Sequence, residues 1–452
     1  MGDIFWHLGK IDKAAREKNM NQKGLVLWFT GPSGSGKSTI AAEVEAELVR
    51  MGFFAYILDG DNLRFGINSD LGFSKEDRDE NIRRIYQIAH LFCEAGQIAL
   101  VAAISPFEKA RQNARETIGQ ENFSLIYVKA SAETRKTRDP KGLYKREVVA
   151  PDMPYEEPQN PEIIIDTDTL SLKEAANVIM GHIFESQMEY LLQKVLETAI
   201  WAAYDAGKEI LEVYKKDFSV EYKADNSPLT EADKRSNALI CERLKKYAPY
   251  IDILAEESAD DKKRLSNKFC FIVDPLDGTK EFVKKNGEFT VNIALAYQNE
   301  PIMGVVYAPC QNKFWYAARG RGAYVNCGIP RLFDEGTKIK VSDKTKELTV
   351  VKSRSHSDEK TEALLEKNKD KIKSLTDVGS SLKGCMIAQG LADIYYRFGP
   401  TMEWDTCAVQ CVVEEAGGIF MQGDQSEMKY NRENSLNDKG FIILNRMENK
   451  LE

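Results

Sequence analysis

Two stretches of this 452-residue sequence have the residue types and spacing that phosphate chemistry requires. The first, "GPSGSGKST" at residues 31–39, has the glycines and lysine of a loop that binds a phosphate chain and transfers a phosphate. The second, "IVDPLDGTKEF" at residues 272–282, places Asp274 and Asp277 three residues apart and follows them with small polar residues. This second stretch is suited to holding metal against a phosphate and hydrolysing it. The sequence therefore predicts both the addition and the removal of phosphate.

The glycine-rich stretch fits the pattern G-x-x-x-x-G-K-S and lies between an apolar run at 25–30 and a segment with helical spacing at 39–50. Glycines let successive backbone N–H groups point at a phosphate chain near the start of a helix. Lys37 is expected to neutralise the transferred phosphate and Ser38 to bind Mg²⁺. The residues predicted to bind ATP are Gly31, Ser33, Gly34, Ser35, Gly36, Lys37, Ser38 and Thr39.

A second polar group, "DGDN" at 59–62, follows the next apolar run at 54–59. Ligands of parallel sheets bind at the carboxyl ends of the strands, so we expect this group beside the phosphate loop. Asp61 is a candidate base or metal ligand at an acceptor hydroxyl, although the same residues could form only a turn. Arg64 and Arg78 would add positive charge there, unless they belong to a solvated helix face.

Further carboxylates could join the aspartates of the second stretch. Glu256 and Glu257 stand at the end of an apolar run, and Asp405 stands at the start of a predicted helix over 403–418. Clustered acids require cations to neutralise them, and Mg²⁺ prefers oxygen ligands. Isolated acidic pairs usually decorate the surface, but "DPLDGT" follows the buried-strand pattern "FIV". We therefore predict a multi-metal phosphatase site.

Length and composition limit the remaining possibilities. A chain of this length predicts two or three domains, and a net charge of −8 argues against nucleic-acid polymers and membrane surfaces as partners. The eight cysteines include no CxxC pair, so a zinc site is not expected. Cys407 and Cys411 are predicted to be core thiols. We find no signal peptide or membrane span and expect a reduced, cytoplasmic protein.

Apolar runs alternate with amphipathic helices in the first third of the chain, which predicts a parallel α/β sheet. The segment 171–216 is helix-rich and interrupted only at Gly181, and we place a domain boundary inside it. Longer strands with period-two alternation follow, which predicts a mixed α/β sandwich. The predicted domains are 1–186 and 187–452, and the predicted strands of the first are 25–30, 54–59, 97–104, 123–130 and 162–167.

The first domain resembles adenylylsulfate kinase, a P-loop kinase. The matching stretches are "GPSGSGKST", "LDGDNLRFGINSDLGFSKEDRDENIRR", "ISP", "RDPKGLY" and "MPYEEPQNPEIIIDT". That family phosphorylates the 3′-hydroxyl of adenosine 5′-phosphosulfate with MgATP. The resemblance implies that Asp61 and Lys37 are catalytic and that Phe73 stacks on the adenine of the substrate. The other implied substrate contacts are Arg64, Arg78, Asn81, Ile104, Ser105 and Lys141.

One departure from the family concerns the lid between "GLYKRE" and "MPYEEP". The family usually has a longer basic lid with a second phenylalanine that closes on the adenine, whereas only "VVAPD" stands here. Half of the stacking clamp is therefore missing from the sequence. Another residue could replace it, the kinase could be weak, or the acceptor could be a different nucleotide.

The second domain resembles the lithium-sensitive phosphatases of the inositol monophosphatase superfamily, whose fold is an α/β/α/β sandwich. Its "SPLTEAD", "NGEFTVNIAL", "SRSH" and "GSSLKGCMIAQGLADIYYRFGPTMEWDT" carry the likeness, and "DPLDGTKEF" with "RFGP" indicates the 3′(2′),5′-bisphosphate nucleotidase branch. The implied metal ligands are Glu256, Asp274, the carbonyl of Leu276, Asp277 and Asp405.

The same resemblance assigns the remaining residues of the phosphatase. Asp233 and the Thr279 hydroxyl would orient and deprotonate the attacking water, and the N–H groups of Gly278 and Thr279 would receive the phosphate. "NGEFTVNIAL" is expected to be a structural strand. The implied substrate contacts are His356, which would lie against the adenine, Ser380, Ser381, Lys383 and Arg397.

The two predicted activities belong to one pathway. The kinase would use ATP and adenosine 5′-phosphosulfate, and the phosphatase would convert 3′,5′-adenosine bisphosphate, left after the sulfuryl group is used, to AMP with Mg²⁺ as cofactor. We expect a homo-oligomer. Two alternatives remain: a 3′-kinase for another nucleotide conjugate paired with its own 3′-phosphatase, and a phosphatase with a degenerate kinase domain that regulates or oligomerises it.

Overall fold

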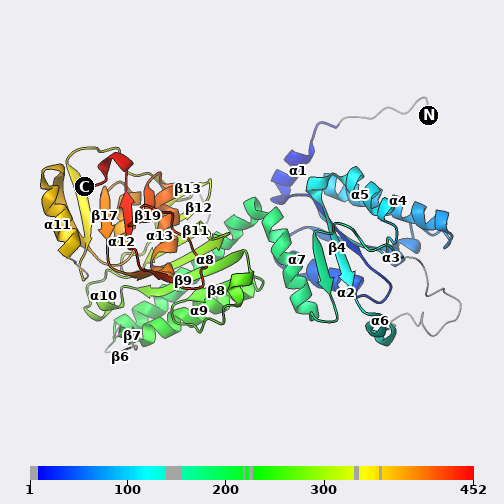
Figure 1. Ribbon diagram of the computed structural model, residues 1–452, viewed down its shortest axis with the longest axis horizontal. Helices are drawn as coiled ribbons and strands as arrows, with labels where there is room; N and C mark the ends of the chain where they lie inside the picture. Colours follow the sequence, from blue (N-terminus) through cyan, green and yellow to red (C-terminus); the bar gives the residue numbers. More distant parts are fainter. Residues whose placement is uncertain (1–8, 139–154, 217–218, 223–227, 330–334, 356–358) are drawn as a thin grey trace. The chain divides into compact units, whose positions relative to one another are not determined.

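The computed structural model describes residues 9–138, 155–216, 219–222, 228–329, 335–355 and 359–452. The chain forms two compact units, Met1–Tyr190 and Leu191–Glu452, each of which is described by itself (Figure 1). Within the described ranges, no helix combines the length and the apolar character needed to span a bilayer.

A five-stranded parallel sheet with strand order β2-β3-β1-β4-β5 forms the centre of the N-terminal unit. All five predicted strands of this unit are present and the parallel sheet is confirmed. Its elements are α1 (Lys13–Met20), β1 (Leu25–Thr30), α2 (Lys37–Arg50), β2 (Ala55–Asp59), α3 (Gly60–Arg64), α4 (Lys75–Glu94), β3 (Ile98–Ala102), α5 (Glu108–Ile118), β4 (Phe123–Lys129), α6 (Ala132–Arg138), β5 (Ile163–Asp166) and α7 (Leu172–Ser186).

Helices cover both faces of this sheet, as its fully buried central strands require. Helices α2 and α7 pack together on one face, and α4 and α5 pack together on the other (Figure 1). On the α4 side, the core contains Trp28, Ile85 and Val101, all with no exposed surface. Because the strands are parallel, the carboxyl ends of β1, β2 and β3 meet at one edge of the sheet.

The predicted helix interruption at Gly181 is wrong. Helix α7 continues through Gly181, and a Cβ there would meet no atom within 4 Å, so nothing forces the chain to bend. The helix ends instead at Gln187, which is fully buried. Its side-chain amide donates to the carbonyl of Lys23 and accepts from the N–H of Lys23, both at 2.7 Å. A glycine costs a helix only about 1 kcal/mol, which tertiary packing outweighs.

The C-terminal unit contains two large sheets. A seven-stranded sheet has the order β14-β13-β12-β11-β10-β9-β8, and a five-stranded sheet has the order β16-β15-β17-β21-β19. The elements are α8 (Met188–Tyr214), β6 (Val220–Tyr222), β7 (Pro228–Thr230), α9 (Glu231–Tyr247), β8 (Asp252–Ala255), β9 (Phe269–Asp277), α10 (Thr279–Val283), β10 (Thr290–Tyr297), β11 (Glu300–Ala308), β12 (Lys313–Ala318), β13 (Gly322–Cys327), β14 (Thr337–Ile339), β15 (Leu348–Ser353), α11 (Glu359–Lys367), β16 (Ile372–Val378), α12 (Leu382–Ala388), β17 (Ile394–Arg397), β18 (Thr401–Met402), α13 (Glu403–Glu415), β19 (Ile419–Gln422), β20 (Leu436–Asn437) and β21 (Phe441–Leu444).

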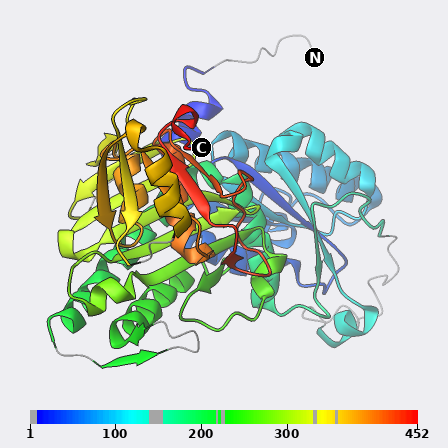
Figure 2. The same ribbon diagram turned by 60° about the vertical axis from the view of Figure 1, so that its left-hand side comes forward.

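These elements stack in layers. Helices α8 and α9 cover the outer face of the seven-stranded sheet, and α12 and α13 lie between the two sheets (Figures 1 and 2). Helix α13 approaches β11 so closely that a Cβ on Gly304 would lie 2.2 Å from the carbonyl oxygen of Ala408. Cys407 and Cys411 are buried in this layer as predicted. The α/β/α/β sandwich is confirmed.

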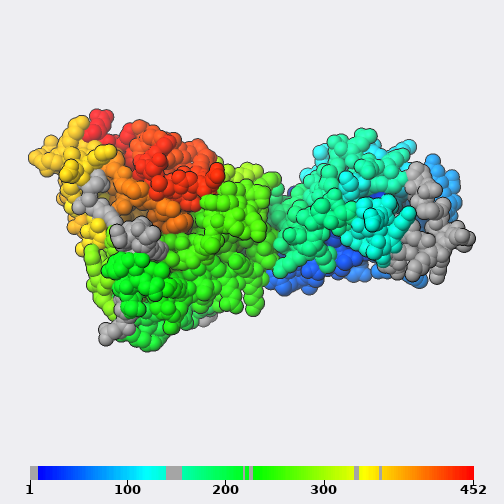
Figure 3. Space-filling view, turned by 60° about the horizontal axis from the view of Figure 1, so that its bottom comes forward, coloured from blue at the N-terminus to red at the C-terminus, as the bar shows by residue number. Residues whose placement is uncertain are grey.

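Segments that are distant in the sequence share the surface of the C-terminal unit. In the space-filling view, the green region of α8 and α9 borders the orange and red region that follows residue 375 (Figure 3). A residue near position 230 can therefore act together with one near position 400, which the site requires.

Candidate active sites

The phosphate loop occupies the carboxyl end of β1 in the N-terminal unit. Gly31 has a φ of +148°, and a Cβ on it would lie 2.3 Å from the carbonyl oxygen of Val128, so only glycine fits there. Lys37 begins α2, and its Nζ donates to the carbonyls of Gly31 and Pro32 at 2.8 and 2.9 Å. The ammonium group is therefore held over the loop that would receive the phosphates.

Asp59 meets the phosphate loop from the end of β2. Its carboxylate accepts from the Ser38 hydroxyl at 2.7 Å and from the N–H of Asp61 at 2.9 Å. The sequence analysis assigned no role to Asp59, although its place in "DGDN" at a strand end was the available signal. Asp61 lies two residues farther on, exposed in the first turn of α3. Asp59 thus contacts the serine expected to bind Mg²⁺, and Asp61 lies in the adjoining helical turn.

The predicted acceptor side gathers around Phe73, whose side chain is 73% exposed. The guanidinium of Arg64 lies over the Phe73 ring at 4.7 Å, and Arg64 also donates to the carbonyl of Gly72 at 2.8 Å. Arg78 donates to the carbonyl of Phe73 at 2.8 Å. The structure therefore brings these three predicted residues together, with Arg64 on the Phe73 ring and Arg78 on the Phe73 backbone.

Two other predicted substrate contacts are engaged in the core. The Asn81 amide oxygen accepts from Asn68 at 2.9 Å and its side chain is buried. The Ser105 hydroxyl accepts from the Trp28 indole at 2.9 Å, and Ser105 adopts a left-handed φ of +38°. Its hydroxyl thus points away from solvent, whereas neighbouring Ile104 is 40% exposed. Lys141 lies outside the described residues.

Helix α6 brings the Arg138 side chain and the Arg135 backbone close to the phosphate loop, and neither residue was assigned a role from the sequence. Arg138 donates to the hydroxyl and the carbonyl of Thr167, both at 2.9 Å, and the Thr167 hydroxyl donates to the Ser35 carbonyl at 3.2 Å. A Cβ on Gly34 would lie 3.2 Å from the Arg135 carbonyl oxygen. No spacing in the sequence relates residue 35 to residue 167, so only the fold could bring them together.

Three carboxylates converge in the C-terminal unit. Asp274 and Asp277 lie at the end of β9, Asp405 lies in the first turn of α13, and one oxygen of each lies within 4.8 Å of the others. Burial, aided by the nearby acidic charges, raises the pKa of Asp405 to about 7 and that of Asp274 well above its usual range. Burying like charges is costly without a counterion, so the cluster fits a divalent cation.

Glu256 and Leu276 complete the predicted ligand set. Glu256 directly follows β8, which is parallel to β9, and its charge contributes to the raised pKa of both Asp274 and Asp405. The Leu276 carbonyl accepts from the Thr279 hydroxyl at 3.2 Å. The five predicted ligands therefore belong to one neighbourhood, built by the ends of two adjacent strands and the start of one helix.

Thr279 and Asp233 form a hydrogen-bonded pair beside this cluster. The Thr279 hydroxyl lies 3.2 Å from the Asp233 carboxylate, which also accepts from the N–H and hydroxyl of Thr230 at 2.7 and 2.6 Å. Asp233 is 2% exposed, and burial raises its pKa. The pair comes from the first turn of α9 and the start of α10. It has the geometry to orient a water and accept its proton.

A cavity of about 380 Å³ opens beside the acids and contains most of the predicted substrate contacts. Ser381 donates its N–H and hydroxyl to Asp277, both at 2.7 Å. Burial lowers the pKa of Lys383 to about 8, and its Nζ donates to the Ser380 carbonyl at 2.6 Å. The predicted residues that line the cavity are Glu256, Asp277, Gly278, Thr279, Ser380, Ser381, Lys383, Arg397 and Asp405, whereas His356 lies outside the described residues.

The far wall of the cavity is apolar and was missed by the sequence analysis. Tyr395, Val409, Phe441 and Ile443 form it. Ile394, Tyr395 and Tyr396 of β17 are all buried, with Tyr395 in one core cluster and its two neighbours in another, so the sequence carried no alternation that marks Tyr395. The cavity therefore offers acidic, cationic and apolar surfaces to a single ligand.

Comparisons with known proteins match each unit to a family. The profile of the adenylylsulphate kinase family matches residues 23–166, and that of the inositol monophosphatase family matches residues 191–451. A probable adenylyl-sulfate kinase of Halalkalibacterium halodurans is 47% identical over 40% of this chain and 93% of its own length. An adenylyl-sulfate kinase of Clostridium acetobutylicum is 49% identical over 36% of this chain and 86% of its own length.

A solved structure is similar to the C-terminal unit. CysQ from Bacteroides thetaiotaomicron, a bacterial member of the inositol monophosphatase family, is 40% identical, with a TM-score of 0.50 over 56% of this chain and 98% of CysQ. The folds and sites define a P-loop kinase joined to a metal-dependent type of phosphatase. The chain belongs to the adenylylsulphate kinase family through its N-terminal unit and to the inositol monophosphatase family through its C-terminal unit.

Proposed function

We propose that the chain is a bifunctional enzyme of sulfate activation. Its kinase phosphorylates the 3′-hydroxyl of adenosine 5′-phosphosulfate with ATP, and its phosphatase removes the 3′-phosphate of 3′,5′-adenosine bisphosphate. Relatives that are 47% and 49% identical and are named adenylyl-sulfate kinases support the first reaction. The CysQ likeness supports a phosphatase of the same family. We place both reactions in the cytoplasm, where eight free cysteines would remain reduced.

In the kinase reaction, Lys37 would leave the carbonyls of the loop and neutralise charge on the transferred phosphate. Ser38 and Asp59 would hold Mg²⁺, which neutralises phosphate charge. Asp61 would accept the proton of the 3′-hydroxyl as that oxygen attacks the terminal phosphorus of ATP, and the bond from that phosphorus to the bridging oxygen breaks to release ADP. Phe73, with Arg64 on its ring, would stack on the adenine of the acceptor.

In the phosphatase reaction, Glu256, Asp274, Asp277, Asp405 and the Leu276 carbonyl would hold Mg²⁺. The metal, when bound, lowers the pKa of water and stabilises the phosphate oxygens. Thr279 would orient the attacking water, and Asp233 would accept its proton through the Thr279 hydroxyl. Attack on phosphorus then breaks the P–O bond to the 3′-oxygen and gives AMP and phosphate.

The observation that carries the choice of a bisphosphate is that one cavity joins the acids to a cationic wall. Arg397 and Lys383 line the same cavity as Glu256, Asp277 and Asp405. Among the described residues, the Ser380 hydroxyl and the Arg397 Nε are buried without a hydrogen-bond partner. Buried polar groups rarely stay unpaired, so we expect both groups to donate hydrogen bonds to an acceptor on the ligand, such as a second phosphate. The apolar wall with Tyr395 would then receive the base.

Purified full chain tests the proposal in two assays. With MgATP and a panel of nucleotide 5′-conjugates, we expect 3′-phosphorylation of adenosine 5′-phosphosulfate, abolished by Lys37→Ala. With Mg²⁺ and 3′,5′-adenosine bisphosphate, we expect phosphate release that lithium inhibits and Asp274→Asn abolishes.

Three results would redirect the proposal. Phosphorylation of a cytidine or other conjugate instead would identify a different acceptor. Absence of kinase activity beside an active phosphatase would indicate a regulatory N-terminal unit. Hydrolysis of inositol phosphates in preference to the bisphosphate would overturn the assigned phosphatase substrate.

A further inference from the structure

A buried arginine connects two segments of the C-terminal unit outside the cavity. The Arg264 side chain is 2% exposed. It donates to the carboxylate of Asp260 at 2.8 Å, to the side-chain oxygen of Asn431 at 2.8 Å and to the carbonyl of Arg432 at 2.9 Å. Residues 260 and 264 follow β8, whereas residues 431 and 432 precede β20, so the arginine ties two loops that are distant in sequence.

A buried glutamate holds the same loop from the other side. Glu403, the first residue of α13, has no exposed surface. Its carboxylate accepts from the N–H of Asn431 at 2.6 Å and from the N–H and Nε of Arg432, both at 3.1 Å. Residues 431 and 432 therefore lie between Arg264 and Glu403, each of which satisfies a different set of their polar groups.

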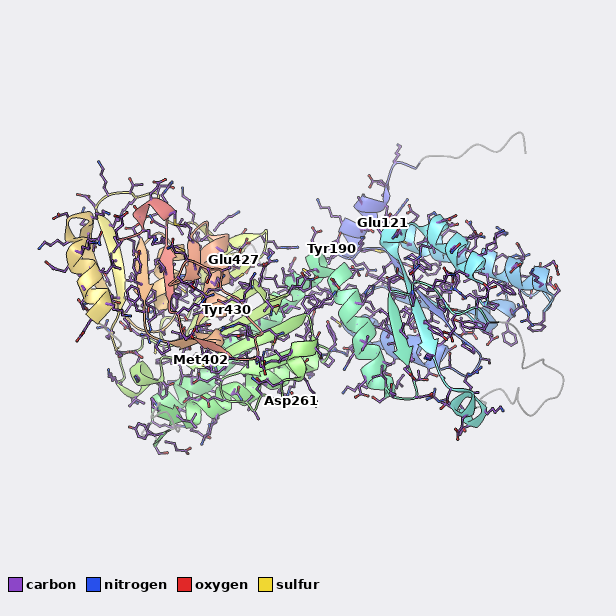
Figure 4. The ribbon with its side chains drawn as sticks, in the orientation of Figure 1. Glu121, Tyr190, Asp261, Met402, Glu427 and Tyr430 are labelled. Carbon is purple, nitrogen blue, oxygen red and sulfur yellow. The ribbon has the colours of Figure 1, made fainter. Side chains whose placement is uncertain are left out.

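The network lies close in sequence to a metal-ligand candidate at each end. Glu256 precedes Asp260 by four residues, and Asp405 follows Glu403 by two. The Asp405 carboxylate accepts from the N–H of Met402 at 2.6 Å. Figure 4 labels Asp261, Met402 and Tyr430, each adjacent in sequence to a member of the network, and all three belong to the C-terminal unit. Displacement of this network would therefore move Asp405 relative to Glu256.

A buried charged network does not in itself raise the free energy of unfolding, because apolar residues of similar volume often stabilise the fold equally well. A fully satisfied buried network does, however, fix one arrangement of the groups it joins. Carboxylates that bind a metal must be held in one orientation. Substitution of the residues that position such ligands commonly changes metal affinity.

We propose that Arg264 and Glu403 are positioning residues of the phosphatase, which hold Asp405 in place opposite Glu256 through Asn431 and Arg432. This inference rests on the proposed metal-dependent phosphatase. Neither residue lines the cavity, so neither contacts the substrate. Their loss should weaken metal binding more than it slows turnover at saturating metal.

The test uses Arg264→Met and Glu403→Gln in the full chain. Binding of Mn²⁺ is measured by EPR of the free ion without substrate, and the half-saturating Mg²⁺ concentration and kcat are measured with 3′,5′-adenosine bisphosphate. Arg319→Met is the matched control, because Arg319 pairs with Glu300 at 3.1 Å on the surface of the same unit and is 45% exposed. We expect about tenfold weaker Mn²⁺ binding in both test variants and a change below about twofold in the control.

Mn²⁺ binding and Mg²⁺ dependence within about twofold of wild type, in variants with wild-type circular dichroism, would overturn the inference. If Arg264→Met fails to fold, the isosteric Glu403→Gln decides the question. Wild-type protein that binds Mn²⁺ but leaves the bisphosphate intact would refute the proposed substrate alone. The Mn²⁺ measurement would still decide the positioning role.

Discussion

The proposed proton path of the phosphatase depends on the pair formed by Asp233 and Thr279, which makes Asp233→Asn an informative change. The carboxylate accepts three hydrogen bonds, two from Thr230 at 2.7 and 2.6 Å and one from Thr279 at 3.2 Å. Asparagine has the same volume, but only one of its two terminal side-chain atoms can accept a hydrogen bond, and its amide cannot take up a proton. Loss of a general base typically lowers turnover about 10²- to 10⁴-fold, equivalent to about 3–5 kcal/mol.

The structural cost of the same change should be small by comparison. Asp233 closes a capping box at the start of α9, and loss of such a cap lowers the free energy of unfolding by about 1 kcal/mol. Asp233 is not one of the three clustered carboxylates, so Mn²⁺ binding should remain at the wild-type value. We therefore expect a large fall in kcat with unchanged metal affinity.

Steady-state phosphate release at saturating Mg²⁺ is the assay, with Thr279 variants as controls. Thr279→Ser keeps the hydroxyl and should retain most activity, whereas Thr279→Val should fall about as far as Asp233→Asn. The double variant Asp233→Asn/Thr279→Val should be no slower than either single variant, because residues that act as a unit are not additive. Turnover of Asp233→Asn within about threefold of wild type would refute the proton path, as would additive losses.

Four further predictions concern other residues of the chain. Because burial raises the pKa of Asp405 to about 7 from 3.8, protons compete with metal, and Mn²⁺ affinity should fall as the pH drops below about 7. Between these pKa values, Asp405 holds a proton in the metal-free folded state but not in the unfolded state. The free energy of unfolding of the metal-free protein should therefore decrease as the pH rises from about 4 to 7. Urea titrations that show an increase over this range would contradict the assignment. Lys37→Ala should abolish ATP-dependent phosphorylation and leave bisphosphate hydrolysis near wild type, because the two units have separate cores. Loss of both activities in a folded variant would indicate that the two active sites are coupled. Gly181→Ala should stabilise the N-terminal unit by about 0.5–1 kcal/mol, because the position is helical and has room for a Cβ. A lower unfolding temperature in calorimetry would show that the added methyl group does not fit.

Much of the fold could be predicted from local patterns. The apolar runs 25–30, 97–104 and 123–130 correspond to β1, β3 and β4, because strands buried on both faces must be continuously apolar. The phosphate loop could also be predicted from the sequence, because its backbone conformation requires glycines. The interruption at Gly181 failed because glycine weakens a helix only slightly, and the amide of Gln187, paired with Lys23, decides where α7 ends.

The sequence by itself determined the chemistry that each unit can perform, because "GPSGSGKST" and "DPLDGT" place donors and acids within a few residues of one another. The tertiary structure alone decided which distant groups complete those sites. It joins Asp233 to Thr279, and Ser381 to Asp277, across 46 and 104 residues respectively. It also turns the Ser105 hydroxyl into the core. Such contacts depend on the order and register of strands and on how helices pack over them, and no local pattern encodes those.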